Sequence, residues 1–323
     1  MSFSSEVKNE ICHIGDDQPS CCNLAELAAL IQICGSIHIS GRRGVSLRIN
    51  TENPGVARRI FLILKKLYKI QAEIVVRRKQ RLRKNNSYYL VLSNNRQAMR
   101  VLLDTGIIRK QDGGDLWINR TVDQNIIKKR CCKRAYIRGA FLGGGSVSDP
   151  EKIYHLEIVT HNETYANSLA NLINEFGLSA RTIGRKSYYV VYLKDGGHIV
   201  DFLSIIGAHA ALLELENIRI YKDMRNNINR IVNCETANLG KTINAAVRQI
   251  ESIQYLRDHY GLSKLTPPLR EIAELRTKNP DASLKELGQM LDPPIGKSGV
   301  NHRLRKLDQM AENLRKKGGS PVD

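Results

Sequence analysis

The feature that most constrains how this chain folds is an internal repeat. The segment CCNLAELAALIQICGSIHI at 21–39 aligns with CCKRAYIRGAFLGGGSVSD at 131–149, which places one cysteine pair over another and Gly35 over Gly145. Further along, NSYYLVL at 86–92 matches KSYYVVY at 186–192, so the offset between the copies falls from 110 to 100. Differences in loop length explain such a drift, and we therefore interpret about 20–115 and about 130–225 as two copies of one unit.

Each copy shows the same expected order of elements, αββαββα. An apolar helix that ends at glycine precedes two alternating strands, at 36–40 and 45–50 in the first copy and at 146–148 and 155–160 in the second. A helix, two strands and a last helix follow, at 54–68, 72–78, 88–93 and 96–103, and at 164–176, 180–185, 188–193 and 197–206. We predict an α+β domain over 1–225 in which the two leading helices pair about a pseudo-twofold axis. Their sheets are expected to form one saddle, in a chain that is monomeric.

The charge of the chain points to an anionic partner. It carries 50 Lys and Arg against 32 Asp and Glu, and residues 226–323 hold only 16 of the basic and 11 of the acidic residues. Most of the basic excess therefore lies in the duplicated domain, although charge alone leaves DNA, RNA and membrane surfaces open. No apolar run reaches the roughly 20 residues of a spanning helix, and the N-terminus has no apolar signal segment. We expect a cytoplasmic protein without a membrane partner.

The two leading helices carry a recognisable motif. Leu27–Gly35, LAALIQICG, resembles the nine-residue LAGLIDADG motif of homing endonucleases, and Ile137–Gly145, IRGAFLGGG, looks like its second copy. The resemblance implies that the residue before the last glycine of each motif should be an acid that holds the divalent cation for DNA cleavage. Those positions are Cys34 and Gly144 here, and neither suits hard Mg²⁺. We therefore expect a nuclease scaffold with no catalytic residues, no cofactor and no enzymatic activity, and an active endonuclease is the less favoured alternative.

The architecture of that family would place a basic hairpin and one sheet face near DNA. Alternation over 45–50 puts Ser46, Arg48 and Asn50 on one face of a strand, and RRKQRLRK at 77–84 has six basic residues in eight. The predicted phosphate contacts are Arg48, Arg77, Arg78, Lys79, Arg81, Arg83 and Lys84. The alternative is that these charges only keep an exposed sheet soluble and block its edges.

A helix-turn-helix (HTH) domain is expected over 265–323, after a charged helical linker over 226–264. Its first helix begins near Pro267 and stops at Asn279, and a capping box formed by Ser283 and Glu286 begins a short second helix. A turn at 292–297 leads to a third helix, for which Ser298 is the expected N-cap. The buried stripe of this third helix is predicted at Val300, Leu304 and Leu307.

The polar side of the third helix has the composition of a recognition helix. Asn301 and Arg303 are expected to read base edges in a major groove, and the other polar residues to donate to phosphates. The predicted DNA-binding residues are Ser283, Lys285, Lys297, Ser298, Asn301, His302, Arg303, Arg305 and Lys306. A structural or protein-binding role for this helix is the alternative. His302 is not expected to bind metal, because no cysteine or carboxylate has suitable spacing nearby.

The repeat and the HTH together resemble one family. LREIAEL at 269–275, SLKELGQML at 283–291 and KSGVNHRLRKLD at 297–308 are similar to the HTH of bacterial WhiA proteins, which also have a degenerate LAGLIDADG domain. The resemblance implies a sequence-specific, nucleoid-associated regulator linked to cell division, chromosome segregation and sporulation. Double-stranded DNA is the expected partner, and another transcription regulator or a sigma factor of RNA polymerase is an open protein partner. The alternative is a division or nucleoid scaffold that binds proteins through the duplicated domain.

The paired cysteines, Cys21–Cys22 and Cys131–Cys132, are not explained by DNA binding. Seven cysteines, four of them in adjacent pairs, favour reduced thiols over a disulfide framework. A pseudo-twofold axis brings a soft-metal site into consideration. Adjacent side chains on a helix, however, point about 100° apart, and cysteine is a common core residue. We therefore predict no metal.

Overall fold

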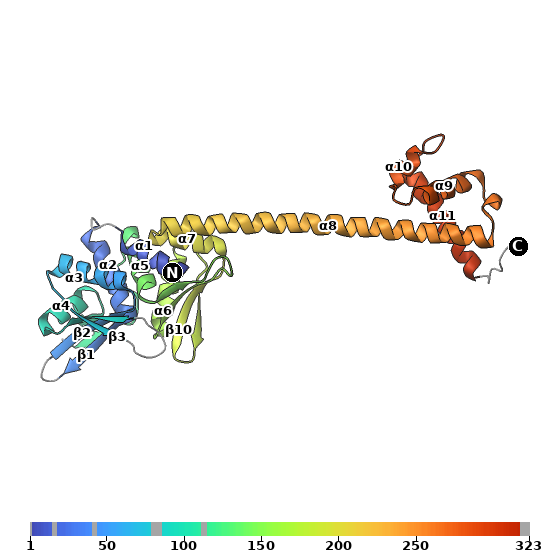
Figure 1. Ribbon diagram of the computed structural model, residues 1–323. Helices are drawn as coiled ribbons and strands as arrows, with labels where there is room; N and C mark the ends of the chain where they lie inside the picture. Colours follow the sequence, from blue (N-terminus) through green and yellow to red (C-terminus); the bar gives the residue numbers. More distant parts are fainter. Residues whose placement is uncertain (1, 15–17, 41–43, 79–85, 111–114, 317–323) are drawn as a thin grey trace. The chain divides into compact units, whose positions relative to one another are not determined.

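Figure 1 shows the computed structural model, which describes residues 2–14, 18–40, 44–78, 86–110 and 115–316. The chain divides into two compact units, Met1–Lys222 and Asp223–Asp323. The boundary predicted from the sequence follows residue 225, close to this division. Among the described residues, no helix combines the length and the apolar character that crossing a bilayer requires.

The first repeat has the predicted order of elements. It comprises α2 (Ser20–Cys34), β1 (Gly35–Ser40), β2 (Gly44–Thr51), α3 (Pro54–Tyr68), β3 (Glu73–Arg78), β4 (Asn86–Leu92) and α4 (Asn95–Asp104). The strands are antiparallel, in the order β1-β2-β4-β3. Local sequence sets the start of α3, because the Asn53 side chain accepts from the backbone N–H groups of Gly55 and Val56 and proline occupies the first helical position.

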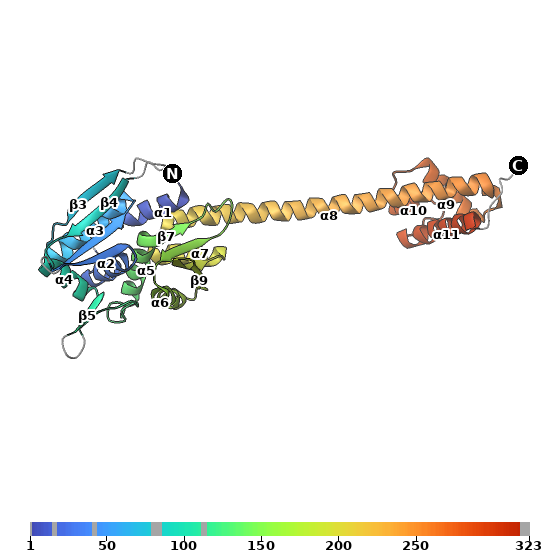
Figure 2. The ribbon, with the colours of Figure 1, turned by 90° about the horizontal axis from the view of Figure 1, so that it is seen from below.

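The second repeat follows the same plan. It comprises α5 (Arg130–Gly144), β7 (Gly145–Val147), β8 (Leu156–Thr160), α6 (Glu163–Asn174), β9 (Arg181–Arg185), β10 (Tyr188–Leu193) and α7 (Gly196–Ile206). Its sheet order, β7-β8-β10-β9, is equivalent to that of the first repeat, and the predicted fold class is confirmed. The described strands of the two repeats form two separate four-stranded sheets. Figures 1 and 2 show these sheets on opposite sides of the α2–α5 pair.

Helices α2 and α5 approach closely because glycine faces backbone at their contact. A Cβ atom on Gly139 would lie only 2.3 Å from the carbonyl oxygen of Glu26, so a side chain there would force the helices apart. At the C-terminal ends, a Cβ on Gly143 would lie 3.6 Å from Sγ of Cys34. The cysteine pairs lie together at the N-terminal ends. The two helices therefore run in the same direction.

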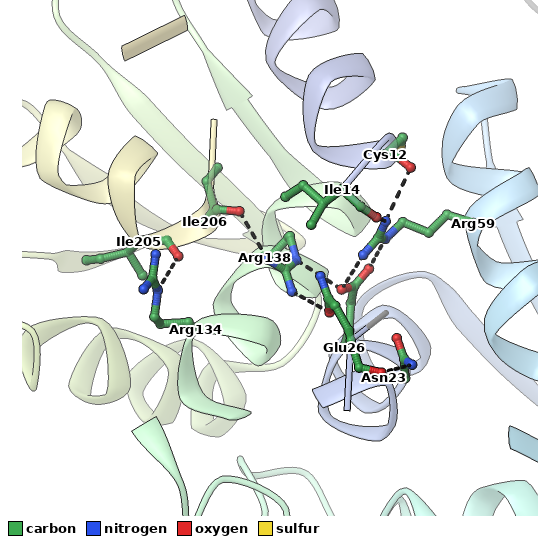
Figure 3. Close-up of polar contacts among 10 residues, drawn as sticks. Cys12, Ile14, Asn23, Glu26, Arg59, Arg134, Arg138, Ile205 and Ile206 are labelled. Atoms are coloured by element: carbon green, nitrogen blue, oxygen red, sulfur yellow. Dashed lines mark hydrogen bonds and ion pairs between the residues drawn. The ribbon is translucent and has the colours of Figure 1, made fainter. Parts of the chain in front are cut away.

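A buried charge network crosses between the repeats beside this helix pair (Figure 3). The Glu26 side chain of α2 is fully buried, and it accepts hydrogen bonds from Arg59 of α3 and from Arg138 of α5. Both arginines donate further hydrogen bonds. Arg59 donates to the carbonyl oxygens of Cys12 and Ile14, and Arg138 donates to the side chain of Gln18 and the carbonyl oxygen of Ile206.

Two parts of the first unit were not predicted. Helix α1 (Phe3–Cys12) packs against α3 and β7, with Phe3, Val7 and Ile11 buried and Ser2 as its N-cap. A small hairpin, β5 (Ile108–Lys110) and β6 (Leu116–Ile118), lies in the chain between the two repeats. Both elements are additions to the duplicated αββαββα plan.

The second unit is helical. Helix α8 (His209–His259) begins in the first unit and continues into the second, where a 3₁₀ turn (Leu262–Lys264) leads to α9 (Pro267–Lys278), α10 (Leu284–Gln289) and α11 (Lys297–Lys316). The prediction of a separate helical linker at 226–264 is wrong in two respects. The helix starts at His209, and Ile253 and Leu256 near its C-terminal end belong to the core of the HTH domain, with Leu269 and Ile272.

Candidate nucleic-acid interface

The buried stripe of α11 fixes which side of this helix is available to a ligand. Val300, Leu304 and Leu307 are fully buried or nearly so, as predicted. The helix begins at Lys297, and the carbonyl oxygen of Gly296 accepts from the N–H groups of Gly299 and Val300. The prediction of Ser298 as N-cap is therefore wrong, because Ser298 lies inside the first helical turn.

The side of α11 opposite this stripe is polar and exposed. At about 100° per residue, Ser298, His302 and Arg305 lie farthest from the stripe among the predicted residues, and all three are exposed. Lys297 and Lys306 are exposed as well, whereas Asn301 and Arg303 are half-buried on the two flanks of the polar side. All seven predicted residues of this helix therefore reach solvent. The centre of the polar side, however, is formed by Ser298, His302 and Arg305 and not by Asn301 and Arg303.

Helix α10 is set by the predicted capping box, which is confirmed. Ser283 N–H donates to Oε2 of Glu286 at 2.7 Å, and Glu286 N–H donates to Oγ of Ser283 at 3.3 Å. These bonds hold the pKa of the Glu286 carboxyl below its ordinary value. Ser283 and Lys285 are exposed beside α11 in the chain's HTH unit. Part of the hydrogen-bonding capacity of Ser283 is already used by the cap.

A buried arginine, Arg276, ties the HTH domain to the end of α8. Its Nε donates to Oε1 of Gln249 at 3.0 Å, and its Nη1 donates to the carbonyl oxygens of Ala282 at 2.7 Å and Pro280 at 3.3 Å. Because the side chain is 2% exposed, these bonds satisfy donors that water does not reach. The segment that leads into α10 is thereby fixed to α8 and α9.

The positions that correspond to nuclease acids lie at the C-terminal ends of α2 and α5. The Cys34 thiol donates to the carbonyl oxygen of Leu30 at 2.9 Å, and desolvation raises its pKa to about 12. A Cβ atom on Gly144 would lie 2.5 Å from the carbonyl oxygen of Val159 and 2.8 Å from Cγ2 of Ile33. The backbone around residue 144 therefore leaves no room for a carboxylate side chain.

An open cavity lies at these helix ends, and neither motif supplies a carboxylate to its lining. It is bordered by α1 as well as by the two motif ends, so Lys8 of α1 lines it together with Cys34 and Gly143. Among the described lining residues, Glu52 alone carries a carboxylate, and it does not come from either motif. Burial lowers the pKa of Lys8. Sequence reasoning missed Lys8, because only the docking of α1 brings it here.

On the exposed face of the first sheet, two arginines from the strands that flank β4 lie close to one tyrosine ring. Val45, Leu47 and Ile49 of β2 are buried and Arg48 faces outward, as the alternation predicted. The guanidinium carbons of Arg48 and Arg77 lie 5.8 Å and 5.4 Å from the ring centre of Tyr89. Arg78 is exposed at the end of β3. The other predicted phosphate contacts, Lys79, Arg81, Arg83 and Lys84, lie outside the described residues.

The second sheet offers basic residues that were not predicted. Arg181 and Arg185 are exposed on β9, which occupies the position in its sheet that β3 occupies in the first. The repeat itself was the available signal, because a phosphate contact on β3 has its topological equivalent on β9. Both sheets thus present arginines on the corresponding strand.

Comparison with known proteins accounts for both units. The WhiA N-terminal LAGLIDADG-like domain matches residues 20–108, the WhiA LAGLIDADG-like domain matches 133–225, and the WhiA C-terminal HTH domain matches 228–311. The chain is 56% identical over 317 residues to the "Probable cell division protein WhiA" of Alkaliphilus metalliredigens, with 98% of this chain and 99% of that protein covered. The chain belongs to the WhiA family.

Further WhiA proteins agree with this assignment. A protein of the same name from Clostridium acetobutylicum is 53% identical over 318 residues, covering 98% of this chain and all of that one. The crystal structure of full-length DUF199/WhiA from Thermatoga maritima matches with a TM-score of 0.59 and 25% identity, over 97% of this chain and 99% of that chain. The Alkaliphilus and Clostridium relatives are named as probable cell division proteins. The match to the WhiA HTH begins inside α8, in agreement with the packing of Ile253 and Leu256 into that domain.

Proposed function

We propose that this WhiA-family protein is a sequence-specific regulator that binds double-stranded DNA, acts in cell division and does not cleave DNA. The observation that carries the proposal is the polar, exposed side of α11, the third helix of the HTH domain. HTH domains insert such a helix into the major groove, where its N-terminal residues contact base edges. The name of the relatives, cell division protein, supports the biological setting.

The geometry of α11 favours a division of roles among its polar residues. Ser298, His302 and Arg305 form the centre of the exposed side, so we assign base reading to them. Asn301 and Arg303, which the sequence analysis expected to read bases, lie on the half-buried flanks. In this proposal Asn301 and Arg303 contact the DNA phosphate backbone at the edges of the major groove. The same role is assigned to Lys297, Lys306, Ser283 and Lys285.

The first unit supplies affinity without sequence information in this proposal. Arg48, Arg77 and Arg78 on the first sheet, and Arg181 and Arg185 on the second, are basic groups on strands with no base-reading helix. Such groups neutralise phosphates and make binding depend on salt. The lack of cleavage is supported by Cys34 and Gly144, which replace both acids and, at residue 144, leave no space for one.

A binding experiment on the full chain tests the proposal. Sheared genomic DNA is titrated in Mg²⁺ buffer at two salt concentrations, and the retained fragments are sequenced. We compare the wild type with a His302→Ala/Arg305→Ala variant and with Lys316→Gln, a control at the C-terminal end of the same helix. We expect one enriched motif with the wild type and the control, lost in the double variant, and intact DNA throughout.

Two outcomes would contradict this proposal. Uniform, salt-sensitive binding that the double variant leaves unchanged would favour the alternative, a division or nucleoid scaffold that binds through the first unit. Magnesium-dependent cleavage by the pure protein would show a nuclease. Roles in chromosome segregation and sporulation, association with the nucleoid, and partners such as a sigma factor rest on the family resemblance, and they belong to the proposal only in that sense.

A further inference from the structure

Four cysteines from the two repeats meet at the N-terminal ends of α2 and α5. The Sγ atoms of Cys21, Cys22, Cys131 and Cys132 all lie within 4.8 Å of one another. The sequence argument against such a cluster, that adjacent side chains diverge on a helix, fails because the two helices lie side by side. Where α2 touches α5, the two adjacent cysteines of each helix lie on either side of the line of contact between the helices. The diverging side chains of one cysteine pair therefore each meet a cysteine of the other helix.

The spacing and surroundings of these sulfurs suit a tetrahedral thiolate site. Zn–S bonds of about 2.3 Å place tetrahedral sulfurs about 3.8 Å apart, so ligation requires only a small contraction of the cluster. Cys22 and Cys132 are buried, Cys21 is half-buried and Cys131 is exposed, which leaves one side of the cluster open for an ion to enter. Seven free cysteines are described, and the other three lie outside this group.

The electrostatics of the helix ends favour negative charge on the cluster. Both α2 and α5 begin one residue before their cysteine pair, so the positive ends of two helix dipoles lie at the sulfurs. The Cys22 thiol donates a hydrogen bond to the sulfur of Cys131. Lys129 and Arg130 at the start of α5 add positive charge beside the same cysteine. Four thiolates around one divalent cation leave a net charge of −2, which these groups offset.

We propose that Cys21, Cys22, Cys131 and Cys132 bind one thiophilic divalent metal ion, zinc in the cell, which joins the two repeats at the base of the α2–α5 pair. Binding releases the thiol protons and involves no redox change. A closed four-cysteine set leaves no open position, so the ion would have a structural role and not a catalytic one. About 110 residues of chain lie between the two cysteine pairs. In the unfolded state, the ion would limit how far apart in space the two pairs can move.

Metal analysis of the full-length, untagged protein tests the proposal. The protein is purified without chelator and in reducing buffer, from cells grown with zinc, and its metal content is measured by mass spectrometry. We expect one zinc per chain in the wild type and in Cys234→Ser, whose thiol is exposed on α8 outside the cluster. We expect the metal to be lost in Cys131→Ser, because residue 131 is exposed and its replacement leaves the core unchanged.

Cobalt substitution gives a second measurement that does not depend on stability. Addition of Co²⁺ to the reduced, metal-free wild type should produce the visible bands of tetrahedral cobalt thiolate, and Cys131→Ser should lose them. Circular dichroism checks that the variant is folded. The proposal is overturned if the reduced wild type neither contains zinc nor takes up added Zn²⁺ or Co²⁺. It is also overturned if peptide mapping of protein from reduced cells finds Cys22–Cys131 or Cys21–Cys132 disulfides in place of metal.

Discussion

Nε of Arg138 donates to Oε2 of Glu26 at 3.0 Å, and this bond joins the second repeat to the first. Arg59 donates to both oxygens of the same carboxylate, so one buried anion is shared by two arginines. The repeats are therefore held by charge as well as by apolar packing. A group of this kind is costly to disrupt from one side, because the remaining charges stay buried without a counterion.

We predict that Glu26→Gln destabilises the first unit by about 3–5 kcal/mol, since Arg59 and Arg138 would lose the anion that they share. Chemical denaturation followed by circular dichroism measures the change. Lys152→Gln, which removes an exposed i, i+3 pair with Asp149, should leave the denaturation midpoint unchanged. Equal midpoints for Glu26→Gln and the wild type would show that the network does not stabilise the repeat interface.

Gly144→Ala tests whether the replaced acidic position still has room for a side chain. Because the new Cβ would lie 2.5 Å from the backbone carbonyl oxygen of Val159, we expect destabilisation by about 1–3 kcal/mol. Gly184→Ala in β9 is the matched control, since its nearest neighbour is a tyrosine ring at 3.6 Å. We further expect that Cys34→Asp/Gly144→Asp fails to create a nuclease. Cleavage of duplex DNA by that double variant in Mg²⁺ would contradict our description of the cavity.

Much of the fold could be predicted because the decisive signals are local or repeated. The apolar spacing predicted the bounds of α3 to the residue, and alternation identified the buried side of β2. The repeat then transferred each assignment to the second copy. Helix α1 was missed although Ser2, Phe3, Val7 and Ile11 have the spacing of a capped amphipathic helix, because it lies outside the repeated segments.

The parts of the candidate site that were missed depend on contacts between distant segments. Lys8 reaches the motif ends only through the docking of α1, and Glu26 meets Arg138 across more than a hundred residues. No pattern along the chain records such a pairing. On α11 the residue types were evident from sequence, but the half-buried positions of Asn301 and Arg303 follow from how the helix packs in its unit.

Gly288→Ala should disrupt the HTH domain selectively. A Cβ atom there would lie 2.2 Å from the carbonyl oxygen of Ile295, in the turn between α10 and α11. We expect a loss of about 1–3 kcal/mol in the second unit and a parallel loss of DNA affinity. Gly240→Ala, on α8 with open space around its Cβ position, is the control and should not weaken binding. Thermal unfolding together with a gel-shift titration distinguishes the two variants.

The thiols of Cys12 and Cys34 should resist alkylation in the native protein. Desolvation raises the pKa of each to about 12, so at pH 8 nearly all of each side chain is the protonated, unreactive thiol. Iodoacetamide at pH 8, followed by peptide mass spectrometry, should label the exposed Cys234 before Cys12 and Cys34. Cys12 and Cys34 should be labelled only after unfolding. Labelling of Cys34 as fast as Cys234 in the folded chain would show that the cavity at the motif ends is more open to reagent than the structure indicates.

The sheet arginines and the HTH should differ in their effect on DNA binding. Arg77→Gln removes a cation from the exposed face of the first sheet, beside Tyr89, and in our proposal this face contacts phosphates and does not read bases. We therefore expect affinity to fall equally for all DNA sequences, and the slope of log affinity against log salt to become shallower by about one unit for each phosphate that is no longer neutralised.

Arg100→Gln is the control, because α4 packs on the opposite, core-facing side of the same sheet. Fluorescence anisotropy with preferred and scrambled duplexes at several salt concentrations measures both quantities. If Arg77→Gln weakens binding to the preferred duplex alone, the sheet takes part in sequence recognition, and the assignment of that role to α11 alone is wrong.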